Sequence, residues 1–568
     1  MSEVIYKGPE FGPEDLLAQH MGALIDQSVA THGDATAFSC VLPTGHAASM
    51  SYSQLGSMTD AMAVFLREEL GLKPGDVVAI QAPNTLAYPV VAFGILKAGL
   101  TITNVNPLYT AEETQHQLQD SGARVLFVID LFGDRVAQSI RDTAVEKVFR
   151  LSLVDLFPGL RRHALGFALK RVKKLVPPFG VDSHGTLASV LAAGRRHMKR
   201  GIDVSQYFAG ADPHSVAFYQ YTGGTTGRSK GALLSHHNVI SNISQGHKRN
   251  EGAVRPGQEV MMLVLPLYHV YALAVGAMTS LHNGTHVVLV PAPRPLANLQ
   301  PVFNNFDITL MPGVNTLYLG LLQENWFTRN PPDSLRYCFS GAAPLQPATA
   351  QAWEKLTGAG IYEGYGLTES TCMVTTTHLA SEPKRGTAGQ PLPGTELRIV
   401  GDDGKDMPPG EPGELWIRGP QVMQGYLNRP DAHAETFADG WLRTGDVAVV
   451  DDEGYLSIVD RMKDMVIVSG FNVYPTDVED VLTRHDSVAE AAVVGAPDAV
   501  TGERVVAYIV KGDDRLTAGD VTAHCRDHLT GYKVPKTVIF VDELPKSPVG
   551  KVLRRDLRDR AAADVEAA

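Results

Sequence analysis

Residues 216–238 read VAFYQYTGGTTGRSKGALLSHHN, and this stretch decides how the rest of the chain is interpreted. Its first six residues are apolar, aromatic or amide side chains, a composition typical of a short buried strand. The next six combine three glycines with three threonine hydroxyls, and Lys230 follows shortly afterwards. Glycine lets successive backbone N–H groups point to one place, and the hydroxyls and the lysine add further donors. The stretch therefore predicts a phosphate-binding loop over residues 222–230.

This loop differs from a Walker A motif, in which the last glycine and the lysine are adjacent and a helix follows at once. Here two residues separate Gly227 from Lys230, and the apolar residues that follow predict a second strand. Ser235 is a suitable N-cap for a helix that begins only after that strand. The loop is therefore expected to join two strands, which disfavours a kinase or a P-loop ATPase. A plain surface turn is the alternative, but a turn does not require so many donors.

Length and composition indicate a globular protein with several structural units. The chain has 568 residues, of which 44% are hydrophobic and 20% are charged. A net charge of −12 argues against a general nucleic-acid binder. The four cysteines lie far apart, which fits a reducing compartment better than a metal site or a disulfide framework. The N-terminus, MSEVIYKGPE, has no signal-peptide character, so a cytoplasmic location is expected.

Two further patterns concern the body of the chain. Residues 50–130 alternate helical and strand patterns, which predicts an α/β sheet. Residues 261–292 contain no Asp, Glu, Lys or Arg and could suggest a membrane span. Because Pro266 and the Asn283–Gly284 pair interrupt that stretch, we expect buried strands and helix instead.

Several sequence motifs resemble those of the adenylate-forming enzymes, which include acyl-CoA synthetases, luciferases and peptide-synthetase adenylation domains. YTGGTTGRSKG (221–231) resembles their phosphate loop, and LKPGDVVAIQAPN (72–84) resembles their N-terminal subdomain. NVNPLYT (104–110) is most similar to bacterial medium- and long-chain fatty acyl-CoA ligases. The resemblance extends over residues 30–560, with the motifs in the family's order.

The resemblance implies an α/β fold with two domains. The large N-terminal domain (1–459) would consist of stacked α/β subdomains and a β-rich subdomain, and it would bind AMP. A hinge (460–464) would join it to a small, mobile α+β C-terminal domain (465–568). The hinge sequence, DRMKD, is by itself equally typical of a solvated hairpin turn. By resemblance, Lys463 is the pivot.

The resemblance also implies a nucleotide site. Tyr365 offers a ring for a base, Thr368 a hydroxyl for the α-phosphate, and Asp446 a carboxylate for the ribose hydroxyls. The small residues after the strand at 336–340 would border adenine, although a tight turn explains them equally well. The ATP- and AMP-binding residues implied are Thr222, Gly223, Gly224, Thr225, Thr226, Gly227, Lys230, Gly341, Ala342, Ala343, Glu363, Gly364, Tyr365, Gly366, Thr368, Asp446, Arg461 and Lys551.

The remaining implied roles concern catalysis and the other substrates. Lys551 would be the catalytic lysine of the adenylation step, and Glu369 with Thr222 would hold Mg²⁺ through hard oxygen atoms. The full set comprises the catalytic residues Lys551, Glu369, Thr368 and His269, the acyl-binding residues His269, Val270, Tyr271 and Val314, and the CoA-binding residues Gly470 and Phe471. Taken alone, a histidine at position 269 is more often a packed core residue. Amino-acid-activating relatives carry an acidic residue near this point, and Tyr268–His269 supplies none.

The function implied is activation of a medium- to long-chain fatty acid by ATP, through an acyl-adenylate, to acyl-CoA with release of AMP and pyrophosphate. Mg²⁺, ATP and CoA are the implied cofactor and co-substrates. An acyl-AMP ligase, a luciferase-like oxidase and a ligase for other carboxylates are alternatives with the same first step. A non-catalytic acyl- or ATP-binding protein is an alternative of another class. The intact Lys230, Glu369, Asp446, Arg461 and Lys551 argue against it.

One segment departs from the acidic character of the chain. Residues 156–181 contain six Lys or Arg residues and no acidic residue. At helical spacing, one face carries Leu165, Ala168, Leu169, Val172 and Val176. Such a helix either docks on the protein by its apolar stripe or lies on an anionic membrane surface. The inner membrane surface and a second copy of the chain, as a homodimer, are therefore candidate partners, whereas nucleic acid is not.

Overall fold

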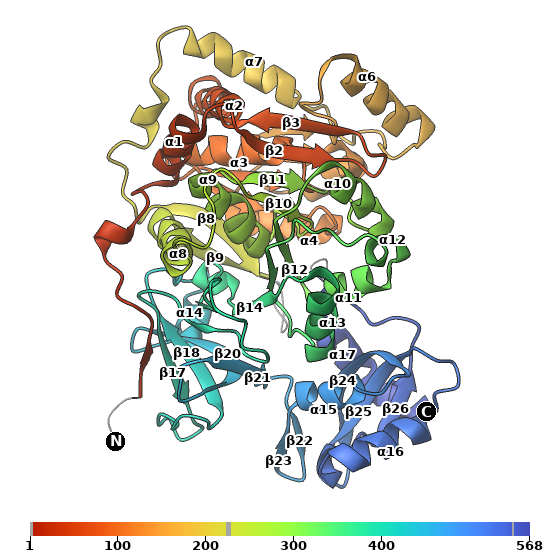
Figure 1. Cartoon of the computed structure of the whole chain (residues 1–568). Coiled ribbons are helices and arrows are strands. Elements are labelled where there is room, and N and C mark those ends of the chain that lie inside the picture. Colours follow the sequence, from red (N-terminus) through yellow and green to blue (C-terminus); the bar gives the residue numbers. More distant parts are fainter. Residues whose placement is uncertain (1–3, 223–228, 548–549, 568) are drawn as a thin grey trace.

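The computed structural model describes residues 4–222, 229–547 and 550–567. Three sheets and their helices form a large N-terminal domain, and a fourth sheet forms a small C-terminal domain below it (Figure 1). This arrangement confirms the predicted α/β fold class with a β-rich part and a small α+β domain.

The first sheet carries the predicted phosphate loop. Its strand order is β7-β6-β4-β5-β8-β9, and every neighbouring pair is parallel except β8 and β9. The strands are β4 (Val77–Gln81), β5 (Thr101–Asn104), β6 (Val125–Ile129), β7 (Lys147–Leu151), β8 (Val216–Thr222) and β9 (Lys230–Ser235). The register pairs Thr222 with Lys230, so the two ends of the loop lie opposite each other. As expected, Ser235 caps the following helix, since its hydroxyl accepts the N–H of Asn238 at 3.1 Å.

The second sheet has nine strands in the order β16-β15-β14-β13-β12-β10-β11-β2-β3. Their bounds are β2 (Thr36–Val41), β3 (Ala47–Ser51), β10 (Val260–Leu263), β11 (His286–Leu289), β12 (Leu310–Gly313), β13 (Tyr337–Ser340), β14 (Ile361–Tyr365), β15 (Thr375–Thr376) and β16 (Gln390–Pro391). The main apolar core contains residues of this sheet, of the first sheet and of the helices between them. The uncharged stretch 261–292 lies in this core as strands β10 and β11 and the helices that join them, as predicted.

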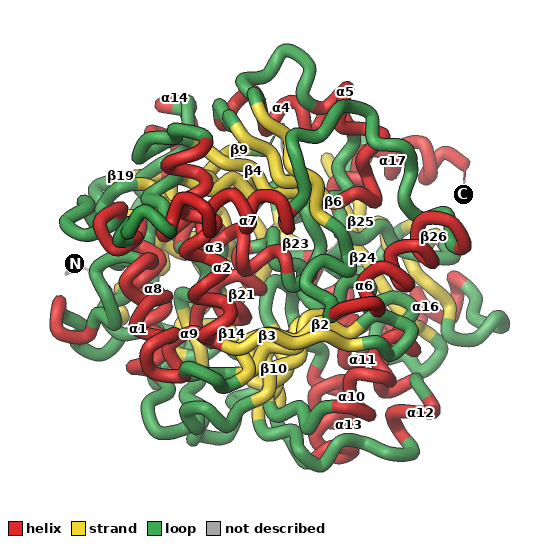
Figure 2. The backbone as a smooth tube through the Cα atoms, turned by 90° about the horizontal axis from the view of Figure 1, so that it is seen from above, coloured by secondary structure: helices red, strands yellow, loops and turns green. Residues whose placement is uncertain are grey.

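Three helices at the upper end of the molecule pack side by side, with α2 between the other two. Figure 2 shows α7 (Leu187–Met198), α2 (Tyr52–Val64) and α3 (Ala87–Lys97) together, with α2 in contact with both others. Helix α3 is buried along its whole length. Its buried Lys97 forms ion pairs with Asp26 and Asp60, which compensate the loss of water around the ammonium group.

The remaining helices connect these layers. The α-helices are α1 (Met21–His32), α4 (Ala111–Ser121), α5 (Val136–Ser139), α6 (Gly159–Phe167), α8 (His236–Arg249), α9 (Thr279–Asn283), α10 (Gln300–Asn305), α11 (Asn315–Gln323), α12 (Asn325–Thr328), α13 (Pro347–Thr357) and α14 (Pro430–Thr436). The π-helices are η2 (Phe65–Glu69), η4 (Ala168–Val172) and η6 (Ala272–Met278). The 3₁₀ helices are η1 (Pro13–Asp15), η3 (Asp130–Arg135), η5 (Val204–Tyr207), η7 (Leu296–Leu299), η8 (Thr368–Ser370) and η9 (Gly531–Lys533).

The third sheet is antiparallel and leads into the C-terminal domain. Its strands are β1 (Tyr6–Lys7), β17 (Glu396–Val400), β18 (Gly413–Arg418), β19 (Phe437–Ala438), β20 (Trp441–Val450) and β21 (Leu456–Arg461). The next strand after β21 belongs to the C-terminal sheet, so the chain passes from one sheet to the other over residues 462–465. The exact domain boundaries and the hinge stay predictions.

The C-terminal domain has two apolar cores of its own, on either side of its sheet. Its strands are β22 (Val466–Val468), β23 (Phe471–Val473), β24 (Val488–Asp498), β25 (Gly502–Lys511) and β26 (Thr537–Phe540), and its helices are α15 (Pro475–Leu482), α16 (Ala518–His528) and α17 (Arg554–Ala567). Strands β24 and β25 form the long central hairpin of this domain.

The basic segment forms α6 and η4, but the predicted apolar face is wrong in one respect. Leu165 and Leu169 pack against the main core as predicted. Val172, however, is 67% exposed. The reason is that the helix widens to π geometry from Ala168, so residues beyond that point no longer follow α-helical spacing. Two apolar residues outside the predicted face, Leu160 (88%) and Phe167 (64%), are exposed as well. In the ranges 4–222, 229–547 and 550–567, no helix is both long and apolar enough to cross a bilayer.

Candidate active site

The phosphate-loop prediction falls largely outside the described residues. Gly223, Gly224, Thr225, Thr226 and Gly227 are among residues 223–228, which are not described, whereas Thr222 and Lys230 are. Thr222 ends β8 and Lys230 begins β9 directly opposite it. The lysine ammonium lies 5.3 Å from the centre of the Tyr426 ring, within the range of a cation–π contact.

Tyr426 also connects this lysine to Glu369. Its hydroxyl donates a hydrogen bond of 2.7 Å to Oε1 of Glu369, which lies in the 3₁₀ turn after β14. The backbone around Tyr426 runs along β9, where Leu427 N–H donates to the Gly231 carbonyl at 2.8 Å. The structure therefore brings Lys230 and Glu369, two predicted site residues, to the same tyrosine.

The role of Tyr426 was missed from the sequence. The Gly425–Tyr426 pair matches the family pattern, but that match does not reveal which side chain the hydroxyl contacts. Glu369 is 57 residues away in sequence, so only the packing of β9 against the 424–427 segment reveals the contact.

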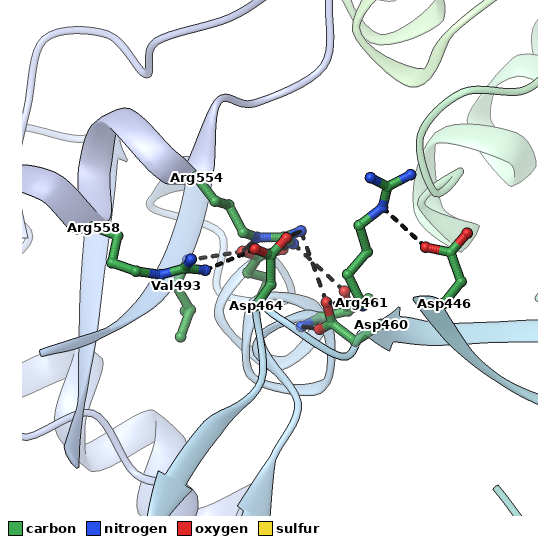
Figure 3. Close-up of polar contacts among 9 residues, drawn as sticks. Asp446, Asp460, Arg461, Asp464, Val493, Arg554 and Arg558 are labelled. Atoms are coloured by element: carbon green, nitrogen blue, oxygen red, sulfur yellow. Dashed lines mark hydrogen bonds and ion pairs between the residues drawn. The ribbon is translucent and has the colours of Figure 1, made fainter. Parts of the chain in front are cut away.

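Asp446 is the centre of a second group of predicted residues. The register of β20 and β21 places it opposite Arg461, whose Nε lies 2.9 Å from its Oδ1 (Figure 3). Tyr365, at the end of β14, donates its hydroxyl to Oδ2 at 2.6 Å. Asp446 is buried, and these two donors compensate the burial of its charge. Each carboxylate oxygen retains a second lone pair, which is what two ribose hydroxyls require.

Small residues at the ends of β13 and β14 give this region its shape. Gly366 is obligatory, since a Cβ there would lie 1.5 Å from the carbonyl oxygen of Cys372. Gly341 faces Gly364 and Tyr271, because its Cβ position is 3.4 Å from the Gly364 carbonyl and 3.5 Å from the Tyr271 ring. Ala342 adopts a left-handed backbone (φ +65°), a conformation that costs energy for a residue other than glycine.

Glu363 lies at the same strand ends, in a small cavity that Leu345, Pro383 and Gly386 also line. Burial raises the pKa of the Glu363 carboxyl to about 7, although the Leu345 N–H donates to it at 3.4 Å. Near neutral pH, Glu363 is therefore able to accept or donate a hydrogen bond to a ligand. This cavity borders the segment that the sequence assigns to adenine.

Lys551 comes from the C-terminal domain and reaches the N-terminal domain. A Cβ on the preceding Gly550 would lie 2.7 Å from Thr316 Oγ1 and 3.3 Å from Val314 Cγ2. Burial, and then the charge of Arg461, lower the pKa of the Lys551 ammonium to about 8. The structure thus places Lys551 near Arg461 and Asp446, although it is distant from both in the sequence.

His269 lies near the same lysine. Burial, and then the Lys551 charge, lower the pKa of His269 to about 4, so this imidazole is neutral at pH 7. Its Nδ1 accepts the Tyr271 N–H at 3.3 Å, which leaves the ring proton on Nε2. His269 is therefore a neutral hydrogen-bond donor between the nucleotide residues and the apolar segment that follows it.

An apolar cavity begins beside His269. Val270 lines it together with Phe218 of β8 and Leu273, Ala274 and Met278 of the π-helix η6, and it is small in this arrangement. Val314, also predicted to contact the acyl group, is buried next to Gly550 instead of lining this cavity. The cavity lining is mainly apolar, as a hydrocarbon chain requires, with Gln220 and Thr371 as the polar members.

The predicted CoA-binding residues lie away from these residues. Gly470 and Phe471 are at the tip of the β22–β23 hairpin, at the lower end of the molecule (Figure 1). Phe471 is 56% exposed and stacks on Tyr532, with ring centres 4.8 Å apart. Lys463 lies in the turn between β21 and β22. The assignment of Gly470 and Phe471 to CoA stays a prediction.

The metal ligands Glu369 and Thr222 stay predictions. Within the described residues, no three His, Cys, Asp or Glu side chains are grouped so that they could hold a metal ion. Mg²⁺ that arrives with a nucleotide needs only one or two protein carboxylates, because phosphates and water complete its shell. Glu369 fits that kind of site and does not fit a metal cage made of protein alone, and Thr222 stays a predicted second ligand.

Comparison with known proteins identifies the family. A model of the AMP-binding enzyme matches residues 25–427, and a model of the AMP-binding enzyme C-terminal domain matches residues 477–551. The chain belongs to the AMP-binding enzyme family. The long-chain-fatty-acid–CoA ligase of Escherichia coli O6:H1 is 42% identical over 548 residues, which cover 96% of each chain.

Two solved structures of this family extend the likeness to three dimensions. ATP-bound MatB from Rhodopseudomonas palustris has a TM-score of 0.79 and 29% identity, covering 95% of this chain and 98% of its own. A fatty acyl CoA synthetase from Mycobacterium tuberculosis has a TM-score of 0.66 and 27% identity, covering 96% of this chain and 99% of its own. The family members therefore share both domains of this chain.

Tyr426→Phe tests the link between Lys230 and Glu369. The substitution removes the hydroxyl that donates to Glu369 and leaves the ring under Lys230 in place. One hydrogen bond to a charged group contributes about 1.5–3 kcal/mol, so we expect roughly tenfold weaker binding of Mg-ATP by calorimetry. Tyr207→Phe is the matched control, because Tyr207 donates to Glu68 at 2.7 Å on the surface. Equal loss of affinity in both variants would contradict a specific role for Tyr426.

Proposed function

We propose that this chain is an ATP-dependent long-chain fatty acid–CoA ligase that acts through an acyl-adenylate and releases AMP and pyrophosphate. The observation that carries the proposal is that Lys551, from the C-terminal domain, lies within electrostatic reach of Arg461, Asp446 and His269. The likeness to the E. coli ligase over nearly the whole of both chains supports the substrate class. The cavity beside Val270 supports an apolar acyl group.

The first half-reaction follows from the chemistry of a carboxylate. A carboxylate is a poor electrophile, so its oxygen first attacks the α-phosphorus of ATP and displaces pyrophosphate. The enzyme must hold the two reactants in line and stabilise the charge that develops on the phosphoryl oxygens. Lys551 supplies a cation at that point, and Asp446 orients the ribose. Neutral His269 donates from Nε2 toward the carboxylate at the mouth of the apolar cavity.

Lys230 and the loop before it are assigned to the β- and γ-phosphates. Mg²⁺ accompanying ATP would be held by Glu369, with Thr222 as a second ligand, and it supplies neutralisation of phosphate charge. Tyr426 keeps Glu369 oriented through its hydrogen bond.

The second half-reaction needs the CoA thiol to reach the acyl carbonyl. Lys551 lies on the small domain, so we propose that this domain rotates about Lys463 after adenylation. The rotation would withdraw Lys551 and bring the Gly470–Phe471 hairpin, now exposed, toward the acyl-adenylate. The thiolate then attacks the carbonyl carbon, the acyl–phosphate bond breaks, and AMP leaves.

An acyl-AMP ligase is the second candidate function, since it shares the first half-reaction. The high identity to a CoA ligase favours the thioester product over a free adenylate. A non-catalytic acyl- or ATP-binding protein is disfavoured by the shared location of Lys551, Arg461 and Asp446.

The function is tested by measuring AMP release with a ladder of fatty acids, with and without CoA. Each buried methylene contributes about 0.8 kcal/mol, so kcat/KM should rise with chain length until the cavity is filled. We expect dodecanoate and longer acids to be preferred, with acyl-CoA as product. Preference for acetate, benzoate or an amino acid would contradict the substrate class, and CoA-independent turnover would favour the acyl-AMP ligase.

The role of Lys551 is tested by separating the half-reactions. Lys551→Ala removes a preorganised donor, so pyrophosphate exchange should fall roughly 10²–10³-fold. Thioester formation from supplied acyl-AMP and CoA should remain close to that of the unmodified protein. Equal loss in both half-reactions would mean that the lysine serves the structure rather than adenylation.

The pH dependence provides an independent check. Because the pKa of Lys551 is lowered to about 8, its charge is present below pH 8 and is lost as the pH rises through that value. The kcat/KM of adenylation should therefore decline above about pH 8, as expected for an essential acid of the free enzyme. Lys551→Arg keeps the charge at all these pH values, so it should be slower but lack this decline.

We also propose that the protein is cytoplasmic and makes peripheral contact with an anionic membrane surface through α6 and η4. Leu165 and Leu169 dock this segment on the core, so its other face is free for a partner. That face exposes Leu160 and Phe167, two helical turns apart, and it carries basic side chains nearby. Docking and membrane contact are thus compatible, each using a different face. The homodimer stays a prediction.

The position of this surface fits a membrane contact. Helix α6 lies at the upper rim of the N-terminal domain, and the C-terminal domain lies at the opposite end (Figure 1). A bilayer at α6 would therefore leave the small domain free to rotate.

Sedimentation with vesicles containing phosphatidylglycerol tests this contact. Each Lys or Arg near an anionic surface contributes about 1 kcal/mol, so replacing Lys170, Arg171, Lys173 and Lys174 by Gln should weaken binding roughly a hundredfold or more. Phe167→Ser should weaken it further, whereas Val500→Ser, at a 91% exposed residue of the C-terminal domain, should not. Binding should also decrease with salt. If the unmodified protein does not sediment with these vesicles, the segment is only a docked helix.

A further inference from the structure

A buried carboxylate at the end of the third sheet contacts the C-terminal domain. Asp460 lies on β21, where it pairs with Val447 of β20, so its backbone belongs to the third sheet. Its Oδ2 accepts the N–H of Thr476, in the first turn of α15, at 2.8 Å. Its Oδ1 lies 4.0 Å from Nη1 of Arg554, the first residue of α17 (Figure 3). Asp460 is only 4% exposed.

The other charged residues around Arg554 follow Lys463 in the sequence and so belong to the C-terminal side of the proposed hinge. Arg554 donates from Nε to Glu479 of α15 at 3.1 Å, and its Nη1 lies 3.9 Å from Asp464. Arg558, one turn further along α17, lies 2.7 Å from the same Asp464 (Figure 3). These contacts would all survive a rotation about Lys463, since both partners lie beyond it. Asp460 also accepts the Arg461 N–H at 2.8 Å, a contact that the rotation would leave intact. Its contacts with Thr476 and Arg554 would be broken, because those two residues are on the moving side.

We propose that Asp460 is a positioning residue that holds the C-terminal domain in the arrangement in which Lys551 reaches the nucleotide site. The inference rests on the proposed function and adds to it the contact that selects one of two domain arrangements. Asp460 does not touch the substrates in this arrangement; it acts through Thr476 and Arg554.

The link from Asp460 to Lys551 is short. Arg554 follows Lys551 by three residues, at the start of α17. Between them, Val552 bridges to Lys546, and the Lys551 carbonyl accepts the Ser547 N–H at 2.8 Å. The lysine loop is thus tied to the base of α17, and an anchor on Arg554 restricts the position of Lys551 as well.

The energetic direction follows from burial. Burial raises the pKa of Asp460 above its ordinary value, and the Arg554 charge opposes that rise. A buried carboxylate that loses such partners is left with unmet hydrogen-bonding capacity until water or another donor reaches it. The present arrangement is therefore favoured by Asp460, and rotation requires that this contact be broken first.

The test compares the two half-reactions in full-length variants. Asp460→Ala removes both contacts, so pyrophosphate exchange should fall roughly tenfold relative to thioester formation from supplied acyl-AMP and CoA. Asp460→Asn still accepts the Thr476 N–H through its amide oxygen and loses only the charge, so the ratio should change in the same direction but less. The ratio is the decisive readout, because a purely structural defect would lower both half-reactions together.

Glu259→Gln is the matched control. Glu259 is 1% exposed, pairs with Arg255 at 3.0 Å and with Arg336, and lies before β10, away from the turn. It should lower the melting temperature and leave the ratio unchanged. An unchanged ratio in Asp460→Ala, with the unmodified protein carrying out both half-reactions, would overturn the role of Asp460 alone. Absence of pyrophosphate exchange in the unmodified protein with every fatty acid would overturn the proposed function and this inference together.

Discussion

The ion pair between Asp446 and Arg461 is the interaction on which the site depends. It forms because neighbouring antiparallel strands place the two residues opposite each other. Tyr365 reaches the same carboxylate from the end of a strand in another sheet, so one buried charge joins two sheets. A buried carboxylate in this position requires these donors, and in the proposed nucleotide site they would fix where the ribose binds.

The same pair also affects the small domain. Arg461 and Lys551 are two cations facing one region, and their repulsion contributes to the lowered pKa of the lysine. A triphosphate bound there would bring negative charge to that region and raise the pKa of Lys551 again. In the proposed function, nucleotide binding and the placement of Lys551 would thus reinforce each other electrostatically. Asp460 precedes Arg461 in the sequence and contacts Arg554 of the C-terminal domain. The residues that surround the nucleotide site are therefore also coupled to the orientation of the small domain.

Much of the fold was predictable because it depends on local patterns. The strands on both sides of the phosphate loop, the Ser235 cap and the burial of residues 261–292 follow from composition, glycine content and capping chemistry. The location of Asp446 beside Arg461 was predictable only through resemblance to a family. The exposure of Val172 was not, since helical spacing alone does not reveal a change to π geometry.

Contacts between distant segments were the hardest to predict. Asp460 and Arg554 are 94 residues apart, and each looks like an ordinary charged residue in its own segment. Tyr426 and Glu369 present the same difficulty at a shorter separation. In both cases the partner is determined by how whole strands and helices pack, which a pattern within one element does not contain. The core of the phosphate loop, residues 223–227, lies outside the described residues.

The π-helix η6 forms one wall of the apolar cavity, and its geometry has a consequence for how substrate range could change. A π-turn holds one residue more than an α-turn, so η6 amounts to an α-helix that has accommodated extra length within the chain. Removal of one residue between Ala272 and Met278 would let the segment return to α winding. That change would rotate Leu273 and Ala274 relative to Met278. The shape of the cavity wall would then change although most of its residues stay the same. Insertions and deletions in this helix, more than exchanges of its side chains, are therefore a direct route by which such a cavity could be lengthened or shortened.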